Sequence, residues 1–122
     1  MEIHVPGGGG FLDALLDTNE AYEGPSDNVI PNADETKLLD ALTALEQGDC
    51  EYVILQDDNK FLQTAGDARS GYTLEYNDGS DRMQFRATDK KISGTAITDA
   101  FVAYLNHDAS WRTQFTWEQF KL

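Results

Sequence analysis

Basic residues are scarce in this chain of 122 residues, and their scarcity narrows the choice of partners. Nine lysines and arginines stand against 22 aspartates and glutamates, for a formal net charge of −13. An acidic surface repels nucleic-acid phosphates and anionic lipids, so we expect no nucleic acid and no membrane as a partner. The acidic excess instead favours rapid association with a basic protein. It is concentrated in residues 1–60, which hold 14 acids and two bases.

The chain also has only short apolar runs and a single cysteine. The longest apolar runs, Tyr52–Leu55 and Phe101–Leu105, fall far short of the ~18 residues of a membrane-spanning helix. The N-terminus has no basic region followed by an apolar stretch, as a secretory signal would have. The single cysteine, Cys50, excludes an internal disulfide. We therefore expect a soluble cytoplasmic protein in which Cys50, flanked by Asp49 and Glu51, is an unreactive structural thiol.

Motifs for catalysis and for metal or phosphate binding are absent. His4 and His107 lie near opposite ends of the chain, and no H-E-x-x-H, C-x-x-C or G-x-S-x-G pattern occurs. The four glycines of residues 7–10 lack the lysine and hydroxyl residue that close a phosphate-binding loop, which indicates a flexible connector. We expect no catalytic residue, no bound metal and no cofactor.

Two segments have the apolar spacing of amphipathic helices. The first covers about residues 33–47, with Asn32 and Glu35 as a capping box. The second covers about residues 95–106. Their buried stripes are expected to consist of Leu38, Leu39, Leu42 and Leu45 in the first helix and of Ile97, Phe101, Tyr104 and Leu105 in the second.

Between these helices the apolar pattern changes to a period of two, which is typical of strands. Polar turns separate four such segments, and Asp78-Gly79 is a strong hairpin signal. The pattern predicts an antiparallel meander of four strands. These strands lie at about residues 50–56, 60–65, 72–76 and 82–87.

The two ends of the chain differ in their patterns. A last strand is predicted from Arg112 onwards, with Phe115 and Trp117 on the face that packs against the core. Residues 1–32 read as a loop-rich segment, apart from a short edge strand in the first five residues. The whole chain, residues 1–122, is expected to form one domain.

The predicted fold class is α+β. It has an antiparallel sheet of about five strands, the four-strand meander plus the C-terminal strand, with both helices packed on one face. The opposite face carries polar side chains, which form either cross-strand ion pairs on a wet surface or a recognition face. The charged members of this polar sheet face are Glu75, Arg82, Arg86, Arg112 and Glu118.

The order of elements in residues 50–120 carries a resemblance. The strand pair GYTLEYNDGS…MQFRA leads to the helical segment ITDAFVAYLNHD and then to TWEQF, a strand with Trp117-Glu118. This order resembles the family-1 immunity proteins of bacterial polymorphic toxin systems, in which a hairpin precedes a helix and a short strand bearing a tryptophan. The resemblance implies a non-enzymatic protein that binds and blocks a cognate toxin, typically a nuclease or deaminase domain. Trp111-Arg112 and residues 1–33 have no counterpart in that pattern.

Three classes of function stay open from the sequence. The first is a small acidic protein-binding module with a basic protein partner, of the immunity-protein kind. The second is a small-molecule-binding or catalytic domain whose pocket between helices and sheet is lined by Tyr72, Tyr76, Tyr104 and Trp117. The third is a homodimer that pairs through an exposed edge strand or through the surface around Trp111 and Phe120. For the first class, the expected partner-binding residues are Asp13, Asp17, Glu20, Glu23, Asp27, Asp34, Glu35, Asp40, Trp111 and Phe120.

Overall fold

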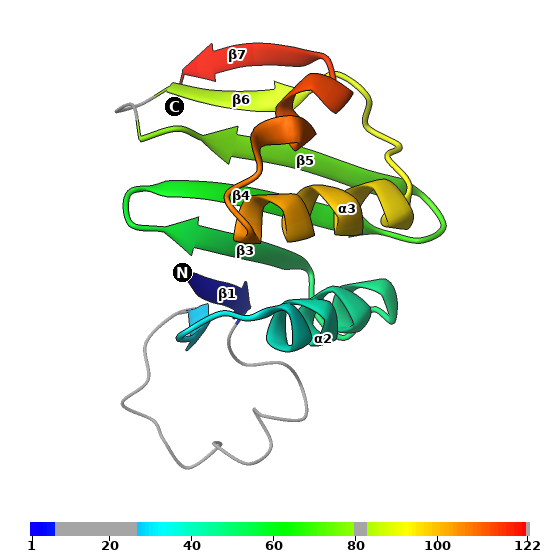
Figure 1. Cartoon of the computed structure of the whole chain (residues 1–122). Helices are drawn as coiled ribbons and strands as arrows, with labels where there is room; N and C mark the ends of the chain where they lie inside the picture. The colour runs from blue at the N-terminus through cyan, green and yellow to red at the C-terminus, as the bar shows by residue number, and fades with distance from the viewer. Residues whose placement is uncertain (7–26, 80–82, 122) are drawn as a thin grey trace.

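One antiparallel sheet of seven strands forms the frame of the molecule, and its helices lie on one face (Figure 1). The computed structural model describes residues 1–6, 27–79 and 83–121. The strands stand in the order β2-β1-β3-β4-β5-β6-β7, and every neighbouring pair is antiparallel. Their bounds are β1 (Glu2–Pro6), β2 (Asp27–Ile30), β3 (Tyr52–Asp57), β4 (Lys60–Asp67), β5 (Gly71–Asn77), β6 (Met83–Ala87) and β7 (Trp117–Lys121).

The α+β class is confirmed, but the sheet has two strands more than the expected five. The additional strands, β1 and β2, come from the first 32 residues. The sequence pattern indicated a short edge strand at the start of the chain, yet β1 lies between β2 and β3. Ile3 explains this position, because it is fully buried and faces Leu55 across the β1–β3 pair. The four residues of β2 are too few to show a period of two.

Helix α2 (Glu35–Glu46) begins about two residues later than expected, and a different residue caps it. The carboxylate of Asp34 accepts a hydrogen bond of 2.8 Å from the backbone amide of Lys37, so Asp34 is the N-cap. Asn32, the expected cap, instead has a left-handed backbone with φ of 54°. The buried stripe also differs in one member: Leu39 is 36% exposed, and Ala41 is buried in its place.

Helix α3 (Gly94–Leu105) begins after Ser93, whose hydroxyl accepts from the backbone amide of Ala96. α2 packs over β1, β3 and β4, and α3 packs over β4 and β5, so both helices cover the same face. Phe101 lies at the centre of this layer and is fully buried. The other large side chains that are fully buried in the described part of the chain are Ile3, Leu38, Leu45, Val53, Leu55, Leu62, Thr64 and Leu74.

The segment before the last strand is not extended as expected. Residues Ala109–Gln114 form a short 3₁₀ helix, η1, and β7 begins only at Trp117. Asp108 caps η1 by accepting a hydrogen bond of 2.9 Å from the backbone amide of Ser110. The expectation of a strand from Arg112 is therefore wrong for residues 112–116. A turn of 3₁₀ helix places Trp111 under α3, which an extended chain would not do.

Two glycines with left-handed backbones provide a test of this packing. Gly71 has φ of +92°, and a β-carbon there would lie 2.5 Å from the Cα of Lys91. That neighbouring chain is held in place because Tyr72 and Ile92 exchange two backbone hydrogen bonds of 3.0 Å. Gly48 has φ of +82°, with nothing within 4 Å of the same added atom.

We predict that Gly71→Ala destabilises the fold more than Gly48→Ala does. Both changes carry the left-handed penalty of about 1–2 kcal/mol. Only Gly71→Ala adds a steric clash, for about 1–3 kcal/mol more. Urea denaturation of the two variants measures the difference, and equal losses of stability would contradict the prediction.

Candidate functional site

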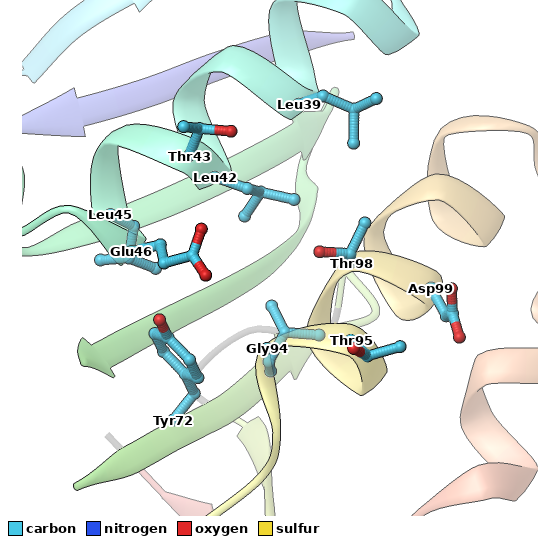
Figure 2. Close-up of a pocket in the computed structure, with 11 residues that line it drawn as sticks. Leu39, Leu42, Thr43, Leu45, Glu46, Tyr72, Gly94, Thr95, Thr98 and Asp99 are labelled. Carbon is cyan, nitrogen blue, oxygen red and sulfur yellow. The ribbon is translucent and has the colours of Figure 1, made fainter. Parts of the chain in front are cut away.

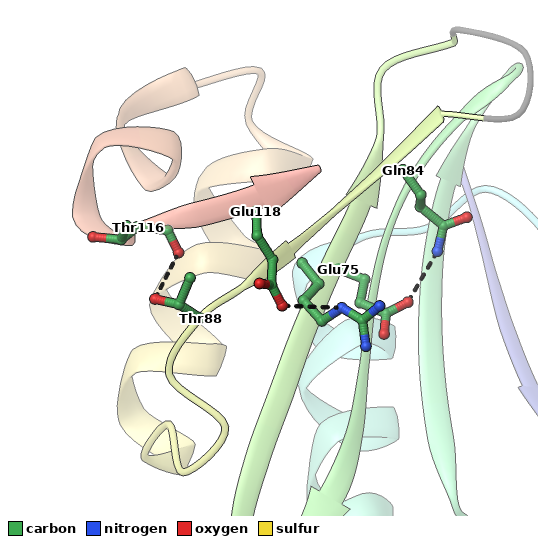
Figure 3. Close-up of polar contacts among 6 residues, drawn as sticks. Glu75, Gln84, Thr88, Thr116 and Glu118 are labelled. Atoms are coloured by element: carbon green, nitrogen blue, oxygen red, sulfur yellow. Dashed lines mark hydrogen bonds and ion pairs between the residues drawn. The ribbon is translucent and has the colours of Figure 1, made fainter. Parts of the chain in front are cut away.

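The polar sheet face holds three of its expected residues side by side. Glu75 on β5 stands opposite Arg86 on β6, and Arg86 stands opposite Glu118 on β7 (Figure 3). They lie on the face that the helices leave uncovered, since Tyr72, Leu74 and Tyr76 of β5 point into the core. The placement of Arg82 lies outside the described residues.

Hydrogen bonds within this face occupy its central carboxylate. Glu75 Oε1 accepts bonds of 3.0 Å from Gln63 Nε2 and 2.9 Å from Gln84 Nε2. Gln84 is only 5% exposed. Arg86 Nε lies 3.5 Å from Glu118 Oε1, and the side chains of Arg86 and Glu118 are 36% and 52% exposed. These contacts support the interpretation as a cross-strand polar network rather than as a recognition face, because its central groups are already paired.

Arg112 does not belong to the polar sheet face, and that expectation is wrong. Its guanidinium carbon lies 4.7 Å from the ring centroid of Tyr76, on the helix side of the sheet. Its Nη2 lies 3.9 Å from Asp78 Oδ2. The cause is the 3₁₀ helix, which turns Arg112 over the aromatic rings beneath η1.

An aromatic cluster packs η1 and β7 against Tyr76 of β5. Trp111 is 6% exposed and meets Tyr76 edge-on, with 5.0 Å between ring centroids. Trp117 meets Tyr76 at 4.7 Å, and its indole N–H donates a 2.8 Å hydrogen bond to the carbonyl of Arg112. Phe115 and Trp117 are half-buried and pack against the core, as expected.

The burial of Trp111 corrects its assignment to the contact surface. A side chain 6% exposed cannot offer its ring to a partner or to a second copy of the chain. Phe120 lies on β7 opposite Gln84 of β6, and its side chain is outside the described residues.

A depression lies next to this cluster, at the end of the sheet. It is lined by Lys60, Tyr76, Tyr104, Trp111 and Arg112, and its volume is about 250 Å³. Burial and then the carboxylate of Asp57 raise the pKa of Tyr104, Arg112 opposes them, and the resulting pKa is about 12. The depression is smaller than the ~300–1,000 Å³ of typical ligand pockets.

A larger groove, the α2–α3 groove, lies between the two helices (Figure 2). Its volume is about 370 Å³, which falls in the range of ligand pockets. Leu42, Leu45 and Ile97 form its buried floor. The other residues lining it are Leu39, Thr43, Glu46, Tyr72, Gly94, Thr95, Thr98 and Asp99.

The described lining of the α2–α3 groove has negative but no positive side chains. Glu46 comes from α2 and Asp99 from α3. Figure 2 shows the carboxylate of Glu46 and the hydroxyl of Tyr72 directed into the same space. The pKa of Tyr72 is raised by burial and then by the carboxylates of Glu46 and Asp67. The groove is therefore apolar at its floor and electronegative at this end.

The pocket expected from four aromatic residues is divided in the structure. Tyr72 lines the α2–α3 groove, whereas Tyr76 and Tyr104 line the depression at the end of the sheet. Trp117 lines neither of them. The sequence analysis missed Glu46, Asp99 and Gly94 as groove residues.

The acidic partner-binding residues are placed in part. Asp34 and Glu35 stand at the start of α2 and Asp40 on its next turn, and all three are exposed. Asp27 opens β2 at the edge of the sheet. Asp13, Asp17, Glu20 and Glu23 lie outside the described residues.

The environment of Cys50 is that of an unreactive thiol. The pKa of the Cys50 thiol is raised by burial and then by Asp49, which disfavours the reactive thiolate. Within the described ranges, histidine, cysteine and acidic side chains form no group that could hold a metal ion. Across these same ranges, no helix combines the length and apolar character needed to cross a membrane.

Comparison with known proteins adds no relative. No family model, no curated protein and no solved structure matches this chain.

Loss of the Glu75 carboxylate is expected to destabilise the sheet. Glu75→Ala leaves the amide donors of Gln63 and Gln84 without their acceptor, and Gln84 is too buried to be hydrated. We predict a cost of about 1–3 kcal/mol in the free energy of unfolding. Glu118→Ala, which removes an exposed ion pair, should cost less than about 1 kcal/mol. Urea unfolding measures both, and a larger loss for Glu118→Ala would contradict this assignment.

Tyr104 should make stability depend on pH in the alkaline range. Its pKa is about 12 in the folded protein, against ~10 in an unfolded chain, so the folded state holds the phenol proton more tightly. This contribution is complete below about pH 10 and is lost as the pH rises towards 12. Tyr104→Phe cannot ionise, so its stability should fall less steeply across this window. Urea unfolding at a series of pH values checks this, and parallel curves would refute it.

Proposed function

We propose that this protein is a small, non-enzymatic binding module whose acidic α2 surface binds a basic protein. The observation that carries the proposal is the charge of the α2 surface, which we define as residues 34–51. Six acids and one base lie there, and all six acids are exposed. The acids are Asp34, Glu35, Asp40, Glu46, Asp49 and Glu51.

The single base on the α2 surface does not balance these acids. Lys37 Nζ donates hydrogen bonds of 3.1 Å and 3.2 Å to the carbonyls of Pro31 and Asn32, before the start of α2. This contact keeps the ammonium group at the N-terminal end of the helix. Within residues 34–51, the middle and the C-terminal end therefore carry acids and no further base.

A surface whose charges are nearly all of one sign affects how the protein meets its partners. It steers an oppositely charged protein during diffusional encounter and raises the association rate, with an effect that falls as salt is added. Ion pairs at the rim of an interface contribute mainly to this rate and to the choice of partner. The α2 surface suits such a role because it stands on a helix anchored by Leu38, Leu42 and Leu45.

The finer proposal is an inhibitor of the immunity-protein kind. Nuclease and other nucleic-acid-processing domains carry basic grooves for phosphates, and an acidic protein can occupy such a groove. The net charge of −13 supports this choice, as does the resemblance in residues 50–120. The proposed partner is accordingly a basic toxin domain.

Removing charge from the α2 surface should weaken partner binding. The test variant is Asp34→Asn, Glu35→Gln and Asp40→Asn combined, and the first of these changes keeps a side-chain oxygen that caps the helix. The partner is captured from native lysate at low salt, identified by mass and then titrated against the purified chain. We expect at least a tenfold loss of affinity in the test variant, and elution of the partner from the wild-type protein at moderate salt.

A charge-matched control separates position from net charge. Asp78→Asn, Asp89→Asn and Glu118→Gln combined also remove three negative charges, all of them outside the α2 surface. This control should bind within about twofold of wild type. The proposal fails if affinity does not depend on salt, or if both triple variants lose affinity equally.

A further inference from the structure

We propose that the α2–α3 groove receives a segment of the basic partner in which an aliphatic side chain lies next to a lysine or arginine. The inference rests on the proposed function, because it names the part of the partner that the acidic module holds. The proposed function alone requires only attraction between opposite charges, whereas this inference assigns the partner a specific docking site.

The floor of the α2–α3 groove selects an aliphatic group. Leu42, Leu45 and Ile97 are each at most 8% exposed, so the bottom is apolar and already closed against the sheet. The volume of about 370 Å³ accommodates only a few side chains, so side chains of the partner segment enter the groove while its backbone stays outside. An inserted leucine-sized side chain would exchange water for apolar contacts, which should favour a leucine-bearing segment over a polar one of the same charge.

Leu39 extends this apolar character to the entrance. It is 36% exposed, and with Val29 it is one of two large hydrophobic side chains exposed in the described part of the chain. Leu39 lies on α2 and lines the groove, whereas Val29 lies on the edge strand β2. Leu39 therefore extends the apolar lining of the groove to the protein surface, where an aliphatic side chain of the partner can contact it.

The electronegative end of the groove selects the cation. Glu46 has its carboxylate directed into the space between the helices, beside the hydroxyl of Tyr72 (Figure 2). No lysine, arginine or histidine is found among the described residues that line the groove. A lysine or arginine placed there would form a charge-assisted hydrogen bond with Glu46, partly shielded from water by Tyr72.

Small residues keep the groove accessible at this end. Gly94 is the first residue of α3, and a β-carbon there would stand 3.5 Å from the ring of Tyr72. Thr98 follows one turn later, and Thr43 lines the groove from α2. Since none of the three has a side chain long enough to bridge the helices, the space between them stays open.

Two synthetic peptides test this docking mode. The first is a helical peptide of leucine and lysine with an apolar and a basic face, and the second has every leucine replaced by serine at the same charge. Binding is measured by calorimetry at low and high salt, with wild type and four variants. The groove variants are Thr43→Phe and Glu46→Gln. Their matched controls on α2 are Thr36→Phe and Glu35→Gln, which lie outside the groove lining.

The expected result is specific to the groove and to the first peptide. Thr43→Phe fills the space, and Glu46→Gln removes the charge partner, so each should weaken the leucine–lysine peptide about tenfold. Thr36→Phe should leave its affinity within about threefold of wild type, whereas Glu35→Gln, which removes one charge of the α2 surface, should weaken both peptides equally and by less than about threefold. The serine–lysine peptide should bind more weakly and should not distinguish groove variants from controls.

The outcomes separate this inference from the proposed function. If affinity depends on salt but groove variants match their controls, or if both peptides bind alike, the groove inference is overturned while the acidic module stands. If binding is insensitive to salt, the proposed function fails as well. Amide shifts of Thr43, Gly94 and Thr98 on adding the first peptide to the wild-type protein provide a test that needs no variant, and shifts confined to Thr36 and its neighbours would overturn the groove inference.

Discussion

The packing of two short helices against the same face of one sheet is the constraint on which the rest of the structure depends. Phe101 of α3 and Leu38 of α2 are fully buried against strands that are themselves fully buried at Val53, Leu62 and Leu74. Apolar area of this kind supplies most of the stability of a small domain. Each helix has 12 residues, too few to be stable alone in water, so the helices depend on the sheet.

This one-sided packing also creates the α2–α3 groove. The two helices meet over β4, but small residues, Thr43 of α2 and Gly94 and Thr98 of α3, line the space between them. Larger residues at Gly94, Thr43 and Thr98 would have closed the gap and enlarged the core. The small residues leave an apolar floor uncovered, and Glu46 makes one end of it negative. The shape and the negative charge of the α2–α3 groove therefore both depend on a few residues at the contact between the two helices.

The C-terminal segment is held by aromatic rings rather than by aliphatic packing. Tyr76 stacks on Phe85 at 4.8 Å and meets Trp111 and Trp117 edge-on. Offset and edge-on ring contacts are worth about 0.5–1.5 kcal/mol each beyond the area they bury. Arg112 covers this cluster from outside, on the side away from the polar network around Glu75. The charged groups on the two faces of the sheet thus have different partners. Arg112 lies against aromatic rings on the helix-covered face, and Glu75 accepts hydrogen bonds from side-chain amides on the opposite face.

The amino-acid sequence by itself determined the elements with a repeating pattern. The helices around Leu42 and Phe101 and the four-strand meander follow from apolar spacing, which records local geometry. The charge of the α2 surface could also be predicted, because charge is a property of composition. The strands β1 and β2 could not, since β2 is too short to show a period and β1 owes its inner position to pairing with β3.

Only the tertiary structure decided what depends on contacts between distant residues. The sequence from Trp111 to Trp117 alternates like a strand, yet the rings of Tyr76 and Tyr104 favour a 3₁₀ turn that buries Trp111 and redirects Arg112. Glu46 and Asp99 line one groove although they lie far apart in the sequence, on different helices. Spacing along the chain reports which residues share a face of one element. It carries no information on which faces meet, because that is decided by the packing of the whole core.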